Sequence, residues 1–371
     1  MSWWGVSLVG LVGLTSIALG AERLRPFGAR SAGERKNRID QSPLFKNGKA
    51  QNLIETRLGL NRKFFGAIRR YIRGGQEPDV ALPVLQPSFG ADPSQELTIT
   101  WLGHSAVVVE LDGVRILTDP VLSQRASPFQ ALGPKRFHVA PATVADLPAL
   151  NAVVISHDHY DHLDMDTIAA LDARSTRFIV PLGVGAHLEA WGVGSERITE
   201  LEWWQDVDVD GLRVVCTPSR HFSGRGFTDR NRTLWASWAL IGGEQRAWFS
   251  GDTGPFEQVV EIGERLGPFD LTMIEIGAYD PAWDSVHMGP DAALEMNALV
   301  GGAALFPIHW GTFNLAAHRW DQPIVRMLDV ANVPVMAPAA GETQRAAAPT
   351  VHPFWAERAA LWSREGRNTL D

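Results

Sequence analysis

The chain has 371 residues, of which 45% are hydrophobic, and its formal net charge is −8. A chain of this size and composition can bury a substantial core, and we expect one large domain with extensions. Its single cysteine, Cys216, excludes an internal disulfide. The acidic charge and the lack of any nucleic-acid-binding motif count against nucleic acid as a partner.

Residues 1–21 form a hydrophobic segment without a charged side chain. The segment is about long enough to span a bilayer, and we predict a membrane anchor. A cleaved signal peptide, with its cleavage site near Ala18-Leu19-Gly20, is the alternative, although the segment lacks a positively charged start. Cations such as Arg23 and Arg25 follow it. By the positive-inside rule, the remainder of the chain is predicted to lie on the cytoplasmic face of the inner (plasma) membrane.

Residues 22–95 are predicted to form a basic arm. Residues 22–73 contain 14 Lys or Arg and four Asp or Glu, a net charge of +10, so residues 74–371 carry −18. Such an arm would be attracted to anionic lipid head groups. Residues 53–72 have the apolar spacing of an amphipathic helix, which could lie on a membrane surface or pack on the body of the protein. Its apolar face would consist of Phe64, Phe65, Ile68 and Ile72.

Residues 96–345 alternate strand and helix patterns, as expected of one α/β (α+β) domain. Strands are predicted near 97–101, 106–111 and 114–118, and helices near 164–173, 256–266 and 290–300. Residues 346–371 are predicted to form a C-terminal tail with a short helical pattern.

The sequence Ser-His-Asp-His-Tyr-Asp-His at 156–162 is the strongest chemical signal in the chain. It follows an apolar run, which predicts a buried strand that delivers ligands at its carboxyl end. His157 and His159 are two residues apart, so in extended backbone they face the same side and can bind one metal ion. Asp161 and His162 follow after the chain has turned and can bind a neighbouring ion. The HxHxDH pattern therefore predicts a two-metal hydrolase rather than a solvated, His-rich turn.

Three further candidate ligands, His221, Asp252 and His309, each follow a later predicted strand. Open α/β folds gather their binding residues at the carboxyl ends of strands, so these side chains are expected to join the first four. Five histidines and two aspartates suit two Zn²⁺ ions, although other divalent metals would also fit. Asp119 could orient a ligand histidine or simply begin a turn. His104 is predicted to be a structural histidine.

Several longer sequence strings make the chain resemble a known family. These are TWLGHSAVVVELDGVRILTDPVLSQRASPFQALGPKRF, ISHDHYDHLD, LEWWQDV, LWASW, SGDTG, ERLGPFDLTMIEIGAYDP and PIHWGTFNLA, between about Thr98 and Leu315. The chain resembles the metallo-β-lactamase superfamily and, within it, the branch of the N-acylphosphatidylethanolamine-hydrolysing phospholipase D. The resemblance implies a four-layer αββα sandwich, preceded here by the hydrophobic N-terminal segment.

The resemblance also implies that two zinc ions share seven side chains. These are His157, His159 and His221 for one ion, Asp161, His162 and His309 for the other, and a catalytic Asp252 that bridges them. His287 matches a family histidine near the reacting phosphate, and is predicted to stabilise the transition state or to protonate the leaving oxygen. Tyr160 could reach the phosphate or be a packed aromatic.

Three departures from the family pattern concern the surroundings of the ligands. The family often has Gln-His-Val-Asp-Pro where this chain has Val286-His287-Met288-Gly289-Pro290, so a polar neighbour of the histidine is missing. Phe222 stands where a tryptophan is familiar. Asp158 replaces an asparagine and is expected to point away from the metals. These changes leave the two-metal chemistry intact and put the head-group preference in doubt.

By this resemblance, the protein would be a zinc-dependent phosphodiesterase of the phospholipase D type. It would hydrolyse N-acylphosphatidylethanolamine-like membrane lipids to N-acylethanolamine and phosphatidic acid. Its partners would be the phospholipid and the membrane surface, the latter through the N-terminal segment and basic arm; the sequence gives no sign of its oligomeric state. Two alternatives remain: a metal-dependent lactonase or other hydrolase of this fold with a soluble substrate, and a non-catalytic, membrane-tethered lipid-binding module.

Overall fold

The computed structural model of the protein describes residues 24–56 and 62–365. The predicted anchor or signal segment, residues 1–21, lies outside them. The helices are η1 (Arg25–Phe27), α2 (Gly33–Gln41), α3 (Arg62–Arg73), η2 (Val144–Asp146), α4 (Met165–Asp172), α5 (Gly185–Trp191), η3 (Ser195–Arg197), η4 (Glu257–Val259), α6 (Val260–Leu266), α7 (Pro290–Val300), α8 (Gln322–Val330) and α9 (Pro353–Glu365). The strands are β1 (Phe45–Lys46), β2 (Lys49–Ala50), β3 (Thr98–Gly103), β4 (Ala106–Leu111), β5 (Val114–Thr118), β6 (Ala152–Val154), β7 (Phe178–Pro181), β8 (Ile198–Leu201), β9 (Asp206–Val209), β10 (Leu212–Thr217), β11 (Ser237–Ile241), β12 (Arg246–Phe249), β13 (Leu271–Glu275), β14 (Leu305–Ile308) and β15 (Thr343–Arg345).

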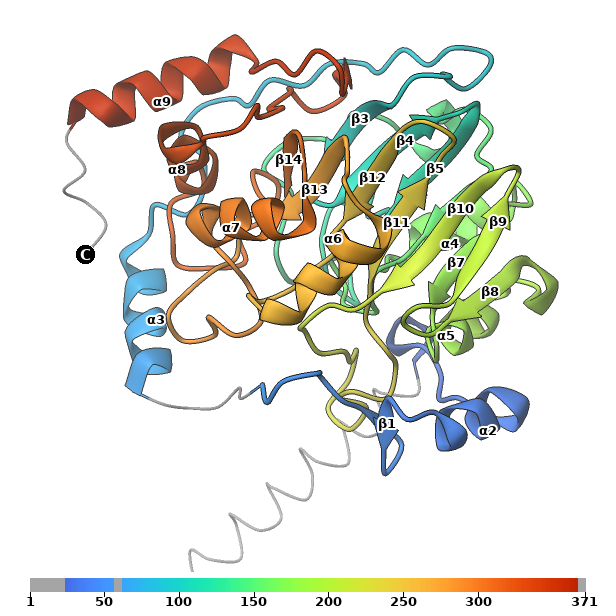
Figure 1. Ribbon diagram of the computed structural model, residues 1–371. Helices are drawn as coiled ribbons and strands as arrows, with labels where there is room; N and C mark the ends of the chain where they lie inside the picture. Colours follow the sequence, from blue (N-terminus) through green and yellow to red (C-terminus); the bar gives the residue numbers. More distant parts are fainter. Residues whose placement is uncertain (1–23, 57–61, 366–371) are drawn as a thin grey trace, which may run out of the picture.

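Two mixed sheets packed face to face form the centre of the molecule (Figure 1). One sheet has seven strands in the order β15-β3-β4-β5-β6-β7-β8, and the other has six in the order β14-β13-β12-β11-β10-β9. Helices α4 and α5 cover the outer face of the first sheet, and α6 and α7 cover that of the second (Figure 1). The protein therefore has the αββα sandwich fold that the resemblance implied.

The strands are apolar on both faces because each sheet packs against the other sheet on its inner face and against helices on its outer face. In β4, Val107 and Val109 pack into the core between the two sheets. Val108 between them points the other way, into a second core that includes Ile168 of α4 and Leu188 of α5. Successive side chains of a strand alternate between faces, so a strand buried on both sides reads as a continuous apolar run. This explains the apolar runs by which the strands were predicted.

Parallel pairing brings the ends of several strands to the same edge of the sandwich. Strands β5, β6, β7 and β8 run parallel in one sheet, and β12, β13 and β14 run parallel in the other. The loops that follow these strands therefore meet at one edge, where open α/β folds place their sites.

The basic arm packs partly on the acidic body. Arg35 lies 2.8 Å from a carboxylate oxygen of Glu189 and 2.7 Å from one of Glu200. In α3, Ala67 is buried and Arg70 lies 2.7 Å from both carboxylate oxygens of Asp280. Part of the arm's positive charge is thus paired within the protein. At least one side of α3 contacts the body, as one of the two readings of the amphipathic pattern proposed.

The predicted helix over 53–72 is wrong at its start, because α3 begins at Arg62 and residues 53–56 are irregular. Arg220 donates to the carbonyl oxygen of Glu55 at 3.1 Å and to the side-chain hydroxyl of Thr56 at 3.0 Å, so a residue of the body binds a backbone carbonyl that a helix would use. The side chains of Phe64, Phe65 and Ile68 lie outside the described set. Within residues 24–56 and 62–365, no helix is both long and apolar enough to cross a membrane.

Candidate metal centre

All the predicted ligands follow strand ends at one edge of the sandwich. The seven-stranded sheet contributes the loop 157–162 after β6, and the six-stranded sheet contributes His221, Asp252 and His309 after β10, β12 and β14. The site therefore lies between the two sheets. Gly251, with a φ of 54°, lets the loop after β12 approach the His-rich loop, because a Cβ there would lie 2.5 Å from the Cβ of Ser156.

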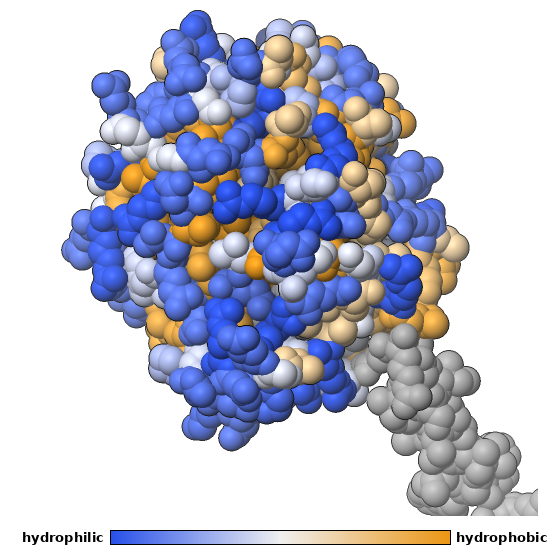
Figure 2. Space-filling model, turned by 90° about the vertical axis from the view of Figure 1, so that its right-hand side faces the viewer, coloured by the Kyte–Doolittle hydropathy of each residue, from blue (hydrophilic) through white to orange (hydrophobic). Residues whose placement is uncertain are grey.

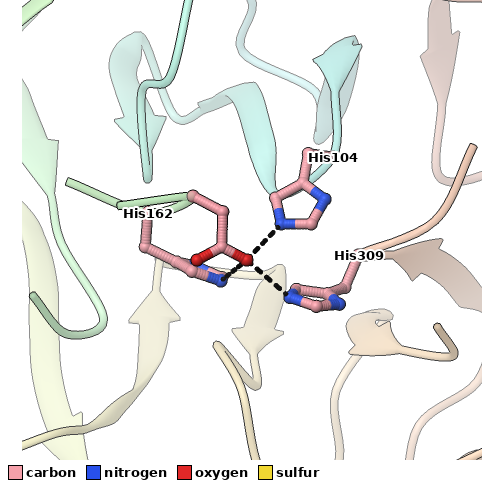
Figure 3. Close-up of side chains that lie close together, drawn as sticks. His104, His162 and His309 are labelled. Carbon is pink, nitrogen blue, oxygen red and sulfur yellow. Dashed lines mark hydrogen bonds and ion pairs between the residues drawn. The ribbon is translucent and has the colours of Figure 1, made fainter. Parts of the chain in front are cut away.

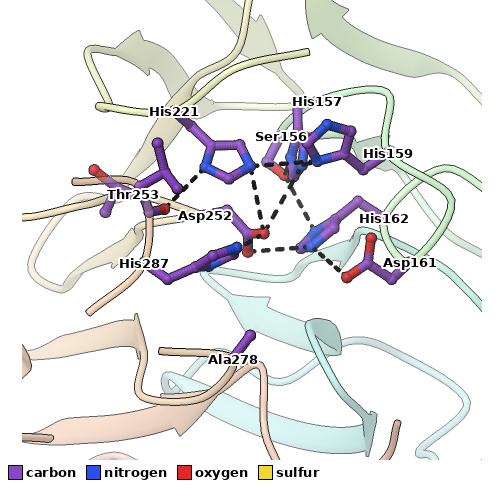
Figure 4. Close-up of polar contacts among 12 residues, drawn as sticks. Ser156, His157, His159, Asp161, His162, His221, Asp252, Thr253, Ala278 and His287 are labelled. Atoms are coloured by element: carbon purple, nitrogen blue, oxygen red, sulfur yellow. Dashed lines mark hydrogen bonds and ion pairs between the residues drawn. The ribbon is translucent and has the colours of Figure 1, made fainter. Parts of the chain in front are cut away.

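The first group of ligand atoms belongs to His157, His159, His221 and Asp252, and these atoms all lie within 4.8 Å of one another. Nδ1 of His159 lies 2.8 Å from Nε2 of His157 and 3.3 Å from Nε2 of His221. The three rings converge in front of the Asp252 carboxylate (Figure 4). These are the residues that the resemblance implied for the first ion, together with the bridging aspartate.

The second group consists of His104, Asp161, His162 and His309, again with ligand atoms within 4.8 Å. Oδ2 of Asp161 lies 3.1 Å from Nε2 of His104, 3.2 Å from that of His309 and 3.5 Å from that of His162 (Figure 3). His104 was predicted to be structural, yet its ring nitrogen faces the same carboxylate as two of the predicted ligands. The signal that could have found it is its position directly after β3.

Asp252 connects the two groups. Its Oδ1 lies 3.1 Å from Nε2 of His162 and its Oδ2 lies 3.1 Å from Nε2 of His309, both from the second group. The same Oδ2 lies 3.7 Å from Nε2 of His221 in the first group. A single carboxylate thus reaches both groups, as a bridging ligand must.

The arrangement of the ligand atoms is better explained by bound metal ions than by hydrogen bonds among the ligand atoms themselves. Nε2 of His162 and Oδ1 of Asp252 are buried and close together, yet neither has a hydrogen-bond partner among the described residues. Buried polar atoms are almost always satisfied, so such a pair indicates a missing ligand between them. Imidazole nitrogens and carboxylate oxygens are the donors that Zn²⁺ and related divalent ions accept.

Burial and the charges of neighbouring side chains act in opposite directions on the pKa values of the site, and the balance differs from residue to residue. Burial holds the pKa of His157 and of His221 well below the usual histidine value, which keeps these rings neutral as metal binding requires. His309 differs: burial lowers its pKa, but the charge of Asp252 and a hydrogen bond to Asp161 outweigh burial and raise it to about 10. Without a bound cation, the neighbouring carboxylates thus favour the protonated, positively charged form of His309. A bound metal ion would supply that positive charge instead.

Asp119 contacts the second group through His162, at the ring nitrogen that does not face the other ligand atoms. Its Oδ2 lies 2.7 Å from Nδ1 of His162, and its Oδ1 accepts the backbone N–H of Ser156 at 2.6 Å. A carboxylate on one ring nitrogen fixes the orientation of the other nitrogen toward a metal. Asp119 thus makes the orienting contact that the sequence suggested. Asp119 at φ 32° and His309 at φ 63° both hold left-handed backbone, a conformation that is costly for such residues and clusters at functional sites.

His287 lies beside both groups and keeps some exposure. Its side chain is 15% exposed, and its ring centroid lies 5.1 Å from that of His221 and 5.2 Å from that of His309. Burial lowers its pKa to about 4. Nδ1 lies 2.8 Å from Oε2 of Glu275, a buried residue that was not predicted from the sequence. The position is consistent with contact to a substrate at the centre, and the chemical role of His287 stays a prediction.

Two other residues of the loop after β6 face away from the ligand atoms. The hydroxyl of Tyr160 donates to the carbonyl of Arg225 at 2.7 Å, and the guanidinium of Arg225 lies 4.1 Å from the Tyr160 ring centroid. Tyr160 is therefore packed here, and its contact with a substrate stays a prediction. Asp158 accepts from the hydroxyl of Thr233 at 2.8 Å and lies 3.2 Å from Nε2 of His187, as expected of a side chain that points away from the metals.

Comparisons with known proteins show which proteins this chain is similar to. The family described as the beta-lactamase superfamily domain matches residues 114–310. An uncharacterized protein of Mycobacterium tuberculosis is 45% identical over 85% of this chain and 88% of its own length. The N-acyl-phosphatidylethanolamine-hydrolyzing phospholipase D 1 of Caenorhabditis elegans is 42% identical over 60% of this chain, which covers 66% of the worm protein.

Solved structures share the fold at lower sequence identity. Igni18, a metallo hydrolase from the hyperthermophilic archaeon Ignicoccus hospitalis, is 22% identical with a TM-score of 0.53. The match covers 67% of this chain and 97% of the archaeal chain. At this identity the likeness establishes the fold of the chain and leaves its substrate open.

Proposed function

The chain belongs to the metallo-β-lactamase superfamily and is a metal-dependent hydrolase, and we propose that it hydrolyses an N-acylphosphatidylethanolamine-like membrane lipid with two zinc ions. Its products would be N-acylethanolamine and phosphatidic acid. The observation that carries the proposal is the pair of adjacent ligand groups that share Asp252. The 42% identity to a phospholipase D of this specificity directs the choice of substrate.

The residues of the site suit hydrolysis of a phosphodiester. Two zinc ions would supply Lewis acidity toward the phosphoryl oxygens and activate water for attack. Asp252 would hold both ions at a fixed separation, and the surrounding histidines would fix their positions. Water attacks phosphorus, the bond from phosphorus to the ethanolamine oxygen breaks, and that oxygen leaves with a proton. His287 lies beside both ligand groups and is 15% exposed, so it is the candidate residue to contact the phosphoryl group, either to stabilise its charge or to protonate the leaving oxygen.

We propose further that the protein works at the cytoplasmic face of an anionic membrane, with the hydrophobic N-terminal segment as a retained anchor. The described chain begins at Leu24, which is 48% exposed, and the following residues lie against the loops that carry Phe129 and Phe227. The ring centroids of Phe27 and Phe129 are 6.1 Å apart, and Arg30 donates to the hydroxyl of Thr228 at 3.0 Å.

Leu24, Phe129 and Phe227, which we call the apolar rim, are exposed apolar residues on these neighbouring segments, and we propose that they contact the lipid bilayer. Phe129 is 42% exposed and Phe227 is 75% exposed. Arginines lie among them, including Arg30 and Arg230, whose charges suit anionic head groups. The face that carries β8 and α5 is largely hydrophilic, with hydrophobic side chains in small groups (Figure 2), and η1, which follows Leu24, packs against α5. We expect the rim side chains to contact the membrane.

The rim is tested by the double variant Phe129→Ser, Phe227→Ser. Loss of two partly immersed aromatic rings should weaken vesicle affinity by about 2 kcal/mol, which is about 30-fold. We expect a rise of this size in the apparent KM for lipid vesicles, with unchanged turnover of the soluble diester bis(p-nitrophenyl) phosphate. Leu361→Ser, at an apolar residue of α9 that is 45% exposed, close to the 42% of Phe129, is the control. Equal KM values for the two variants would contradict the membrane role of the rim.

The substrate is tested with zinc-loaded protein and vesicles of N-acylphosphatidylethanolamine. Mass spectrometry should detect N-acylethanolamine and phosphatidic acid, and both should disappear after chelation of the metals and return when zinc is restored. Activity on soluble lactones with none on the vesicles would instead assign the protein to another hydrolase of this fold. Release of fatty acid in place of the two expected products would also refute the phospholipase D type of cleavage.

A further inference from the structure

Glu275 is a buried carboxylate at the end of an otherwise apolar strand. It is the last residue of β13, its exposed fraction is 0%, and its flanking residues Ile274 and Ile276 are equally buried. A carboxylate in such surroundings is costly unless both oxygens have partners. Both do: Oε1 accepts the backbone N–H of Thr253 at 2.5 Å, and Oε2 lies 2.8 Å from Nδ1 of His287.

The place of Glu275 in the sheet connects it to the metal centre. Strand β13 runs between β12 and β14, whose ends carry Asp252 and His309. One oxygen of Glu275 binds the residue after Asp252 and the other binds His287. Glu275 thus contacts both the backbone next to Asp252 and the ring of His287, whose Nδ1 lies 3.9 Å from Oδ2 of Asp252.

His287 needs such a support because no regular element carries it. It lies in the irregular connection between β13 and α7, where local backbone geometry alone fixes a side chain poorly. Its ring packs against His221 and His309, but ring contacts of this kind do not distinguish between the two ring nitrogens. The bond to Glu275 fixes which nitrogen faces the protein. Among the described residues, the hydrogen bonds of the His287 ring use Nδ1 only, so Nε2 remains for the substrate.

We propose that Glu275 is a positioning residue, which holds His287 by Nδ1 so that Nε2 faces the scissile phosphodiester. The kinetic part of this proposal rests on the proposed function. It also accounts for a departure in the sequence: the polar residue that the family often has before this histidine is Val286 here. Glu275 supplies a polar partner from the neighbouring strand instead.

A different role for Glu275 as a metal ligand is the competing possibility. Ligand atoms of Asp252, Glu275, His287 and His309 lie within 4.8 Å of one another. Positioning is favoured because both oxygens of Glu275 already have hydrogen-bond partners and because the nearest nitrogen, Nδ1 of His287, is itself one of them. A ligand role predicts that Glu275→Leu loses a metal ion, whereas a positioning role predicts that its metal content is unchanged.

The kinetic test is a double-mutant cycle of Glu275→Leu and His287→Ala with N-acylphosphatidylethanolamine. Misplacement of a reacting group by about 1 Å can cost about 10²-fold, so we expect Glu275→Leu to lower kcat by 10- to 100-fold with KM little changed. In the His287→Ala background the same substitution should have no further effect, because its target is gone.

Glu275→Gln, which keeps an acceptor for Thr253 and a polar group at Nδ1, should stay within about tenfold of the wild type. Thr272→Val, which removes a different buried hydrogen bond from β13, is the matched control and should leave kcat unchanged.

Two further measurements keep the proposal testable whatever the substrate. Elemental analysis should find the same metal content in Glu275→Leu as in the wild type; loss of a metal would make Glu275 a ligand and overturn the proposal.

In ¹⁵N NMR of labelled histidines, the His287 signals, assigned with His287→Ala, should shift in Glu275→Leu and return toward the wild type in Glu275→Gln. Unchanged His287 signals in Glu275→Leu, or additive losses in the cycle, would also overturn it. If the wild type does not cleave the lipid, the proposed function fails and the NMR result alone decides the positioning.

Discussion

Replacement of Asp252 with asparagine is expected to lower turnover by about 10³-fold or more. Asp252 is the residue whose carboxylate reaches both ligand groups, with contacts of 3.1 Å to His162 and His309 and 3.7 Å to His221. Asparagine keeps the shape but removes the charge, and its amide N–H would face ring nitrogens or a cation. Two-metal sites supply several kcal/mol of transition-state stabilisation, and each 1.36 kcal/mol lost is a factor of ten in rate.

The measurement is turnover together with metal content for Asp252→Asn. We expect fewer metal ions per chain than in the wild type, because the shared ligand has lost its charge. Asp206→Asn, at an exposed aspartate of β9 in the same sheet, is the matched control and should change neither quantity. A fully metallated Asp252→Asn variant with wild-type turnover would show that the bridge is not needed and would remove the main support for two-metal catalysis.

The sequence predicted which side chains lie together at the candidate metal centre because their signal is local. His157, His159, Asp161 and His162 fall within six residues, and the strand before them is an apolar run that cannot be mistaken for a loop. The later ligands, such as Asp252, follow equally clear strands. Only the family resemblance, however, paired the strands into two sheets, because neither periodicity nor spacing states which strands are neighbours.

His104 and Glu275 show what local signals miss. His104 follows a strand as the ligands do, but a lone histidine at a strand end is more often structural, and its proximity to Asp161 depends on the docking of two loops 57 residues apart. Glu275 occurs within the apolar run of β13, so the local pattern predicts a strand residue and gives no sign of a functional role. A single carboxylate in a strand that is buried on both faces is itself a signal, because its burial needs a compensating partner. Which partner it has, His287, follows only from the fold.

The start of α3 was misjudged for a related reason. Apolar spacing over 53–72 satisfies a helical pattern, but Arg220 binds the carbonyl of Glu55 from a loop far along the chain. Such a tertiary contact overrides a local preference and cannot be read from the segment alone.

His287→Ala is expected to lower kcat for the lipid by about 10² to 10⁴-fold while both metal ions stay bound. Proton transfer by a positioned side chain contributes a factor of this size. His287 is not among the seven predicted ligands, and its Nδ1 is already bound to Glu275, so its loss should leave the metal content unchanged. Elemental analysis and lipid turnover measure the two quantities. His352→Ala, at a histidine that caps the start of α9, is the control and should leave both unchanged.

The leaving group separates the two chemical roles that His287 can have. If His287 protonates the leaving oxygen, its loss should matter much less for bis(p-nitrophenyl) phosphate, because p-nitrophenolate leaves without a proton whereas an ethanolamine alkoxide does not. We expect His287→Ala to lose at least tenfold less activity on this diester than on the lipid. Equal losses on both substrates would assign His287 to stabilisation of the phosphoryl charge instead. Full activity on the lipid would exclude both roles, and loss of a metal ion would make His287 a ligand.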